Sequence, residues 1–229
     1  MRDRQRRFAI SGGSVSGALT LPDAAPSGTV VVLAHGAGSN MANPLLVGLA
    51  ADLAQHGFPS LRFNFPYTER RERVPDRAPI LEACYGAVLE QLRADPELRV
   101  ERLVIGGKSL GGRMASHLAA AGEAVQGLLF LGYPLHPAGK PQQLRAAHLA
   151  RITAPMLFFT GTRDALCRLD LLQPVLDGIA NATLHLIEDG DHSFAVRKRS
   201  GRDAAAVCRE IAQASVDWLR HTVEAQTAQ

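Results

Sequence analysis

The chain has 229 residues, of which 46% are hydrophobic and 21% charged, and it carries a net charge of +3. This length and composition suit one α/β domain with a sizeable core, and no apolar stretch approaches the roughly 18 residues of a membrane helix. The three cysteines are widely spaced with no Cys-x-x-Cys pair, which argues against a disulfide framework or a zinc site and, with no apolar signal behind the N-terminal arginines, predicts a cytoplasmic protein.

The excess positive charge is concentrated in two runs of arginines. They are Arg2, Arg4, Arg6 and Arg7, and Arg70, Arg71, Arg73 and Arg77. Such runs occur in nucleic-acid-binding patches, but arginines on tails and loops are more often simply solvated. We therefore expect residues 1–7 to form a flexible basic tail, and we expect no nucleic-acid partner.

Behind this tail, the sequence predicts an alternation of strands and helices. Phe8–Ile10 and Val15–Leu21, separated by Ser-Gly-Gly-Ser, are typical of an antiparallel hairpin at a sheet edge. Apolar, largely β-branched runs predict further strands at Thr29–Ala34, Ser60–Phe65, Leu103–Gly106, Leu128–Leu131, Met156–Thr160 and Thr183–Ile187. Helical spacing of apolar residues predicts helices at Pro44–His56, Pro79–Ala94, Leu110–Ala121 and Asp203–Glu224. This alternation predicts a single domain over residues 1–229, with a mostly parallel sheet flanked by helices.

The strongest chemical signal is the sequence Gly-Lys-Ser-Leu-Gly at residues 107–111. It follows an apolar strand and precedes a helix of small residues, which is the strand–turn–helix setting of a nucleophile elbow. The glycines let strand and helix approach closely while the serine occupies a sharp turn. We therefore predict that Ser109 is a nucleophile at a helix N-terminus, whose amides favour negative charge.

A second glycine-rich loop, His-Gly-Ala-Gly at residues 35–38, directly follows the strand Thr29–Ala34. Such a loop supplies one N–H group of an oxyanion hole, and the residue after the nucleophile supplies the other. We assign these roles to the backbone N–H groups of Ala37 and Leu110. We expect His35 to fix the loop through hydrogen bonds, with a catalytic role for this histidine as the alternative.

The acid and the base are expected after the last two strands. His192 follows the final strand in Asp-Gly-Asp-His-Ser-Phe, and Asp164 follows the penultimate strand in Gly-Thr-Arg-Asp. The chain order of serine, acid and histidine is the order required in this arrangement. An ionised aspartate holds the imidazole in the correct tautomer. Asp189 and Asp191 are the alternative acids, and otherwise they shape the histidine turn.

Six motifs in this order resemble the α/β-hydrolase family that includes the Tex30-like proteins and the hydrolase-like domain of a KAT8-complex subunit. They are HGAGSNMANPLL, LRFNFPY, GGKSLGGRM, GYPLHPAGKP, GTRD and DGDHSF. The resemblance spans residues 8–220 and implies an α/β-hydrolase fold with Ser109, Asp164 and His192 as a catalytic triad. Bacterial members are labelled dienelactone-hydrolase-like, but true dienelactone hydrolases use a cysteine nucleophile, and this chain has a serine.

The segment 133–154 joins the strand after the nucleophile helix to the next strand. It leaves room for a loop and one short helix but for no cap domain. We therefore expect a shallow, open pocket.

Positive charge surrounds the predicted nucleophile. Lys108 precedes it, Arg113 lies one turn into its helix, and His136 lies on the loop after the next strand. With Gly36 of the oxyanion loop and Tyr67, which the resemblance implies, these residues are our candidates for substrate binding. One interpretation is recognition of a carboxylate or phosphate on the substrate. The other is structural, with Lys108 buried against acidic partners and Arg113 fixing the neighbouring loops.

These residues together predict a serine hydrolase that cleaves a small ester, thioester or related acyl bond. Its partner is then a small-molecule acyl substrate, with no metal, no organic cofactor and no membrane involved. The alternatives are a non-catalytic interaction module and acyl transfer to an acceptor other than water. A scaffold has no need for a serine, an acid and a histidine in this order, so the sequence favours catalysis.

Overall fold

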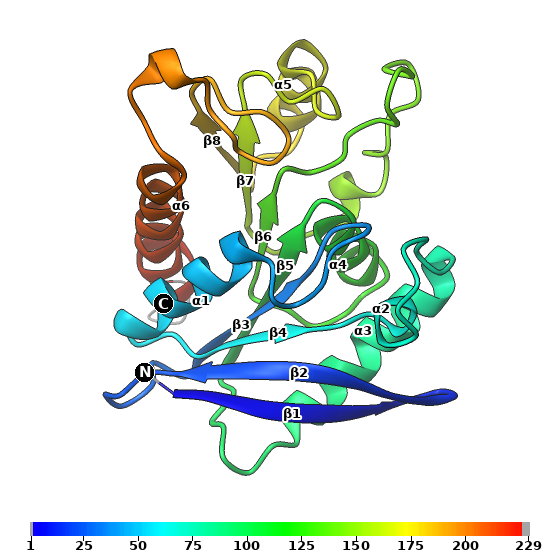
Figure 1. Cartoon of the computed structure of the whole chain (residues 1–229), viewed down its shortest axis with the longest axis vertical. Coiled ribbons are helices and arrows are strands. Elements are labelled where there is room, and N and C mark those ends of the chain that lie inside the picture. Colours follow the sequence, from blue (N-terminus) through cyan, green and yellow to red (C-terminus); the bar gives the residue numbers. More distant parts are fainter. Residues whose placement is uncertain (1, 226–229) are drawn as a thin grey trace.

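The computed structural model describes residues 2–225. Its centre is an eight-stranded sheet with the strand order β1-β2-β4-β3-β5-β6-β7-β8 (Figure 1). The strands are β1 (Arg2–Ile10), β2 (Gly13–Leu21), β3 (Thr29–Ala34), β4 (Ser60–Phe63), β5 (Arg102–Lys108), β6 (Gly127–Leu131), β7 (Met156–Gly161) and β8 (Ala182–Ile187). Strands β3 to β8 are parallel, and β1 and β2 form an antiparallel hairpin at one edge.

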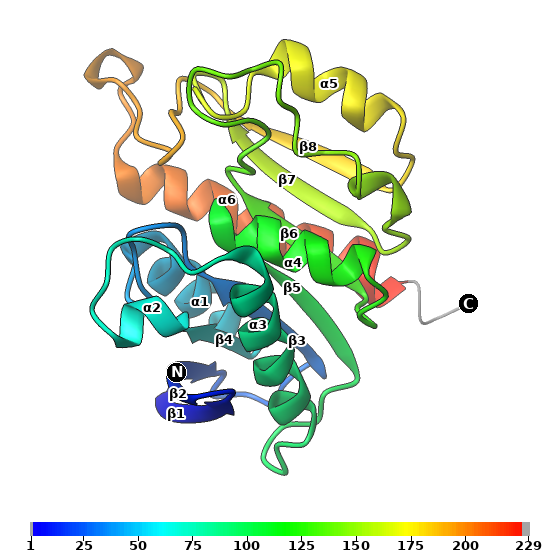
Figure 2. The ribbon, with the colours of Figure 1, turned by 90° about the vertical axis from the view of Figure 1, so that its right-hand side faces the viewer.

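Helices cover both faces of this sheet (Figure 2). The α-helices are α1 (Pro44–Gln55), α2 (Pro66–Glu69), α3 (Ala78–Arg93), α4 (Leu110–Ala120), α5 (Leu169–Asp177) and α6 (Ala204–Trp218). Helices α1 and α6 pack on one face, whereas α3, α4 and α5 pack on the other, so that the sheet separates two hydrophobic clusters. The predicted α/β-hydrolase fold is confirmed by this layered, mostly parallel arrangement.

Strand β3 shows why the central strands are apolar along their whole length. All its residues are buried, and they alternate between the two clusters, since successive side chains of a strand point to opposite faces. Val30 and Val32 pack in the cluster under α3 and α4. Val31 and Leu33 pack in the cluster under α1 and α6. A strand with helices on both faces thus needs apolar residues at odd and even positions alike.

The prediction of a flexible basic tail at residues 1–7 is wrong for the described part of that segment. Strand β1 begins at Arg2 and pairs with β2 along its whole length. Antiparallel pairing uses backbone groups, so it does not require apolar side chains at an edge strand. Acidic partners also hold two of its basic side chains, since Arg4 Nη1 lies 2.6 Å from Glu97 Oε2 and Arg6 also pairs with this carboxylate.

The connection between β6 and β7 contains one 3₁₀ turn, Leu149–Arg151, and no cap domain. The expected absence of a cap is therefore confirmed. The carboxyl ends of β3, β5, β7 and β8 open onto the same edge of the sheet, and the loops there carry the candidate site residues. No helix within residues 2–225 is long and apolar enough to cross a membrane.

Candidate active site

Three side chains from loops after β5, β7 and β8 form a continuous chain of hydrogen bonds. Ser109 Oγ lies 2.9 Å from His192 Nε2. The other ring nitrogen, Nδ1, lies 2.9 and 2.8 Å from the two carboxylate oxygens of Asp164. The Asp164 side chain is fully shielded from solvent, whereas that of His192 is 22% exposed. The imidazole can therefore take a proton from the serine while the buried carboxylate orients it.

The backbone at Ser109 has the shape of an elbow. Its φ of 50° and ψ of −111° lie in a region that residues with a side chain rarely adopt. A Cβ atom on Gly111 would lie 2.3 Å from the carbonyl oxygen of Ala34, and one on Gly107 would lie 2.1 Å from the same atom. Only glycine fits these positions, so the flanking glycines allow α4 to start directly against β3.

The glycine-rich loop after β3 lies against the serine. A Cβ atom on Gly36 would lie 3.5 Å from the Cβ of Ser109. Leu110 is the first residue of α4, and within the described chain neither its N–H nor that of Ala37 donates to a protein acceptor. The two amides that the sequence assigns to an oxyanion hole are thus unused by the protein beside the nucleophile.

His35 is fully buried and fixes this loop. Its Nε2 accepts a hydrogen bond from the Phe65 N–H at 3.1 Å, and its Nδ1 lies 2.9 Å from the Gly36 carbonyl. Burial lowers the pKa of His35 to about 4, so the ring is neutral near pH 7. These contacts agree with the structural interpretation of His35, and His192 is the histidine that contacts Ser109.

Three of the predicted substrate-binding residues are buried and bonded to protein groups. Tyr67 donates to the Gly36 carbonyl at 3.3 Å and so supports the glycine-rich loop after β3. His136 Nε2 lies 3.5 Å from the Arg168 N–H. Lys108 is only 8% exposed and donates to the backbone carbonyl of His192. Burial lowers the pKa of Lys108 to about 8, although nearby carboxylates, including that of Asp164, oppose this shift.

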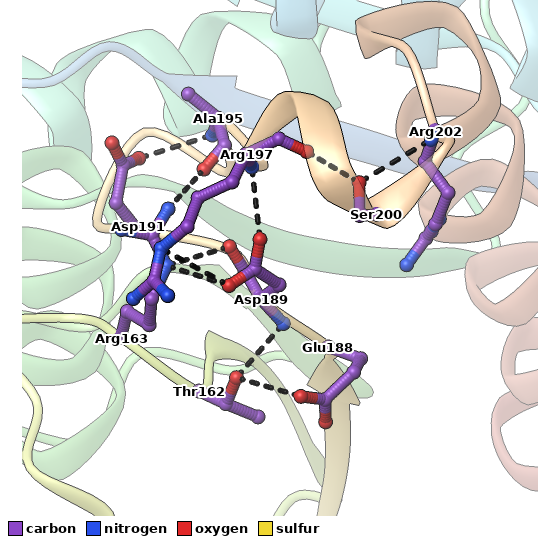
Figure 3. Close-up of polar contacts among 9 residues, drawn as sticks. All are labelled: Thr162, Arg163, Glu188, Asp189, Asp191, Ala195, Arg197, Ser200 and Arg202. Carbon is purple, nitrogen blue, oxygen red and sulfur yellow. Dashed lines mark hydrogen bonds and ion pairs between the residues drawn. The ribbon is translucent and has the colours of Figure 1, made fainter.

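The loop that carries His192 is tied to the loop that carries Asp164 (Figure 3). Arg163 donates from Nε to the Asp189 carbonyl at 2.9 Å and from Nη2 to the Ala195 carbonyl at 3.2 Å. Its Nε also lies 3.1 Å from the Asp189 carboxylate. Arg163 therefore holds Asp164 and His192 in register, and its position next to Asp164 was the only sign of this role in the sequence.

The two alternative acids shape the histidine turn. Asp189, with a φ of 56°, accepts a hydrogen bond from the Arg197 N–H at 2.9 Å, and this bond is the main reason that its pKa is lowered. Asp191 Oδ1 accepts from the N–H groups of Ser193 and Ala195 at 2.8 and 3.0 Å. Neither carboxylate has a hydrogen bond or ion pair to His192. In the described part of the chain, no group of three or more His, Cys, Asp or Glu could hold a metal ion.

Comparisons with known proteins agree with this architecture. The family model described as an alpha/beta hydrolase domain matches residues 27–220. Dienelactone hydrolase from Anabaena variabilis is 21% identical, with a TM-score of 0.78 over 97% of this chain and 98% of that one. A serine hydrolase without lid from Xanthomonas campestris is 21% identical, with a TM-score of 0.71 over 99% and 95%. Est1E from Butyrivibrio proteoclasticus is 14% identical, with a TM-score of 0.77 over 96% and 99%.

Proposed function

The chain belongs to the alpha/beta hydrolase domain family, and we propose that it is a serine hydrolase that cleaves a small ester, thioester or related acyl bond. The observation that supports this proposal is the unbroken contact from Ser109 through His192 to Asp164. A scaffold or interaction module would not require this alignment. The narrower resemblance to the Tex30-like proteins and the cytoplasmic location remain part of the proposal.

The proposed reaction proceeds in two halves. Ser109 Oγ attacks the acyl carbon while His192 Nε2 takes its proton, and the N–H groups of Ala37 and Leu110 stabilise the negative oxygen. The bond to the leaving group then breaks as His192 returns the proton to it. Water attacks the resulting acyl-enzyme with His192 again as the base, and the acid leaves as Ser109 regains its proton.

The absence of a cap domain supports a small substrate. The segment between β6 and β7 contains one 3₁₀ turn, Leu149–Arg151, and provides little apolar wall for a long acyl chain. The Xanthomonas neighbour is likewise described as lacking a lid. We propose short acyl groups as the substrates of this enzyme.

Covalent labelling tests the proposal directly. A small fluorophosphonate is incubated with the protein, and the adduct is located by mass spectrometry of peptides. We expect one label per chain on Ser109, because His192 activates this hydroxyl. Ser109→Ala should abolish the label, and His192→Ala should slow it severely while circular dichroism shows a folded protein. Absence of any label on folded wild-type protein would favour the interaction module instead.

A further inference from the structure

Two arginine side chains, Arg113 on α4 and Arg145 on the connection between β6 and β7, have no acceptor in the described part of the chain. Both residues are half-buried, and Arg113 Nε is buried without a hydrogen-bond partner. Among residues 2–225, neither guanidinium forms a hydrogen bond or an ion pair. Other half-buried arginines here do have carboxylates, as Arg163 has Asp189. Unused donors on both guanidiniums are therefore a special feature of this pair.

The two guanidiniums also influence each other. The pKa of Arg145 is lowered first by burial and then by the positive charge of Arg113. Arg113 further lowers the pKa of the neighbouring His148, which burial brings to about 4, so this ring adds no charge near pH 7. Two like charges close together without a counter-ion are unfavourable, and an anion bound between them would relieve the repulsion.

Hydrogen bonds fix the main chain at both arginines. The Tyr133 hydroxyl donates to the Arg145 carbonyl at 2.8 Å and lies 3.5 Å from Ser116 Oγ. Ser116 Oγ in turn donates to the Arg113 carbonyl at 2.7 Å. The N–H of Arg145 donates to the Leu135 carbonyl at 2.7 Å. Hydrogen bonds thus hold the backbone at both arginines in one framework, unlike that of a free surface loop.

The two segments that carry these arginines both begin close to the candidate triad. The N–H of Arg113 donates to the Ser109 carbonyl at 3.1 Å, so Arg113 is one helical turn away, about 6 Å along the axis of α4. The loop that carries Arg145 starts at Gly132, where a Cβ atom would lie 3.5 Å from His192 Cε1. This loop runs between α4 and α5 (Figure 2). Arg113 thus lies one helical turn from Ser109, and the loop that carries Arg145 begins beside the imidazole of His192.

We propose that Arg113 and Arg145 bind an anionic oxygen group, a carboxylate or phosphate, on the acyl substrate that Ser109 cleaves. The planar forks of two guanidiniums offer parallel N–H donors that match the oxygens of such a group. This inference rests on the proposed function, and it narrows the substrate class to anionic esters or thioesters. Arg113 was already a candidate for substrate binding from the sequence, and Arg145 is the second arginine of the proposed anion site.

Matched ester pairs test this proposal. We would measure kcat/KM for para-nitrophenyl hexanoate and para-nitrophenyl monoadipate, which differ in a carboxylate on the acyl side. Phenyl butyrate is compared with its para-carboxy and para-phosphate derivatives, which carry the charge on the alcohol side. The readout is the ratio of kcat/KM for the anionic ester to that for its neutral partner, so a general loss of activity cancels.

We expect this ratio to fall by about tenfold or more for at least one anionic ester in both Arg113→Gln and Arg145→Gln. Arg113→Lys and Arg145→Lys keep the positive charge but lose the planar guanidinium, so a smaller fall in the ratio is expected for them. These variants test the proposal if the glutamine variants do not fold. Arg209→Gln removes an exposed arginine on α6 and should leave every ratio unchanged. Ratios equal to wild type in all variants of the pair would overturn the proposal.

Anion binding to the Ser109→Ala protein distinguishes a failure of the proposed hydrolase function from a failure of the proposed anion site. Adipate and inorganic phosphate are titrated calorimetrically into this variant, with and without Arg113→Gln. One outcome is anion binding that depends on Arg113, while the wild-type protein hydrolyses no neutral ester and takes up no fluorophosphonate. This outcome would refute the proposed hydrolase function but support the anion site. Hydrolysis of neutral esters, with neither anion binding nor a change in the ratios, would refute the anion site alone.

Discussion

At the scale of single residues, the proposed triad depends on the contact that Asp164 makes with His192. Both its carboxylate oxygens lie within 2.9 Å of His192 Nδ1, and one of them also accepts a hydrogen bond from the Leu166 N–H at 2.8 Å. A carboxylate held in this way fixes the imidazole ring and stabilises its protonated form. Asp189 and Asp191 instead bond to backbone N–H groups of the histidine loop.

The first prediction concerns this choice of acid. Asp164→Asn should lower kcat by about 10⁴, because an amide favours the wrong imidazole tautomer. Asp189→Asn and Asp191→Asn should have much smaller effects on kcat, since those residues act only through the loop. The kcat for ester hydrolysis is measured for the three purified variants and for wild type. Near-normal turnover in Asp164→Asn, with loss in either of the others, would mean that the acid is misassigned.

His35 predicts an acid-sensitive component of stability. Its pKa is about 4 in the folded protein and near its usual value of about 6.5 when unfolded. Between these values the unfolded chain binds the extra proton, so this contribution is present above about pH 6.5 and is lost as the pH falls toward 4. The loss should reach about 3 kcal/mol.

Urea unfolding of wild type and His35→Gln at several pH values measures this effect. Glutamine does not titrate, so the free energy of unfolding of the variant should fall less steeply between pH 6.5 and pH 4. Other groups, such as His148, titrate in both proteins, and the difference between the curves isolates His35. Parallel curves would contradict a buried, neutral His35.

At the scale of elements, the sequence predicts best where one constraint dominates. The central strands were predictable because Val30 to Leu33 are apolar at every position, as burial on both faces requires. The hairpin strand at Phe8–Ile10 was predicted, but the preceding part of β1 was missed because its arginines conceal a strand held by backbone pairing. Helix α5 was missed because it is short and contains Pro174, which normally argues against a helix.

In the candidate site, too, some features could be predicted from the sequence and others could not. Glycine spacing predicts the elbow, since Gly107 and Gly111 have no room for a side chain. Chain order predicts Asp164 and His192, which lie in the loops after two neighbouring strands. The inward position of Lys108 and the bond from Arg163 to the histidine loop depend on how separate loops meet. No local pattern encodes such contacts.

The elbow yields a prediction at this scale. Gly111→Ala would place a Cβ atom 2.3 Å from the Ala34 carbonyl oxygen, which forces β3 and α4 apart. We expect a loss of about 3 kcal/mol in stability or more, and slower fluorophosphonate labelling of Ser109. Thermal unfolding and labelling rates measure both effects.

Gly86→Ala is the matched control for this substitution. Gly86 lies within α3, and a Cβ atom there would meet no atom within 4 Å. Alanine should therefore raise stability by about 0.5 to 1 kcal/mol through its better helix propensity, with labelling unchanged. Equal effects of the two substitutions would show that the close approach at Gly111 is not what positions the serine.

At the scale of the whole molecule, the lack of a cap predicts selectivity for short chains. Rates for neutral esters should fall steeply beyond butyl or hexyl groups, because each further CH₂ stays in water instead of gaining about 0.8 kcal/mol from burial. A series of para-nitrophenyl esters from acetate to palmitate measures this selectivity. Faster hydrolysis of the long-chain members would contradict an open site.

The placement of the triad on β5, β7 and β8 also affects how the protein is made. A growing chain presents Ser109, directly after β5, well before His192 exists, since the histidine follows the last strand at the sheet edge. Domains of this kind fold around non-local strand pairs that form only when both partners are present. On the proposed mechanism, Ser109 lacks its base during synthesis and becomes activated only once the segment after β8 has brought His192 against it. On the same proposal, incomplete chains are expected to hydrolyse no ester.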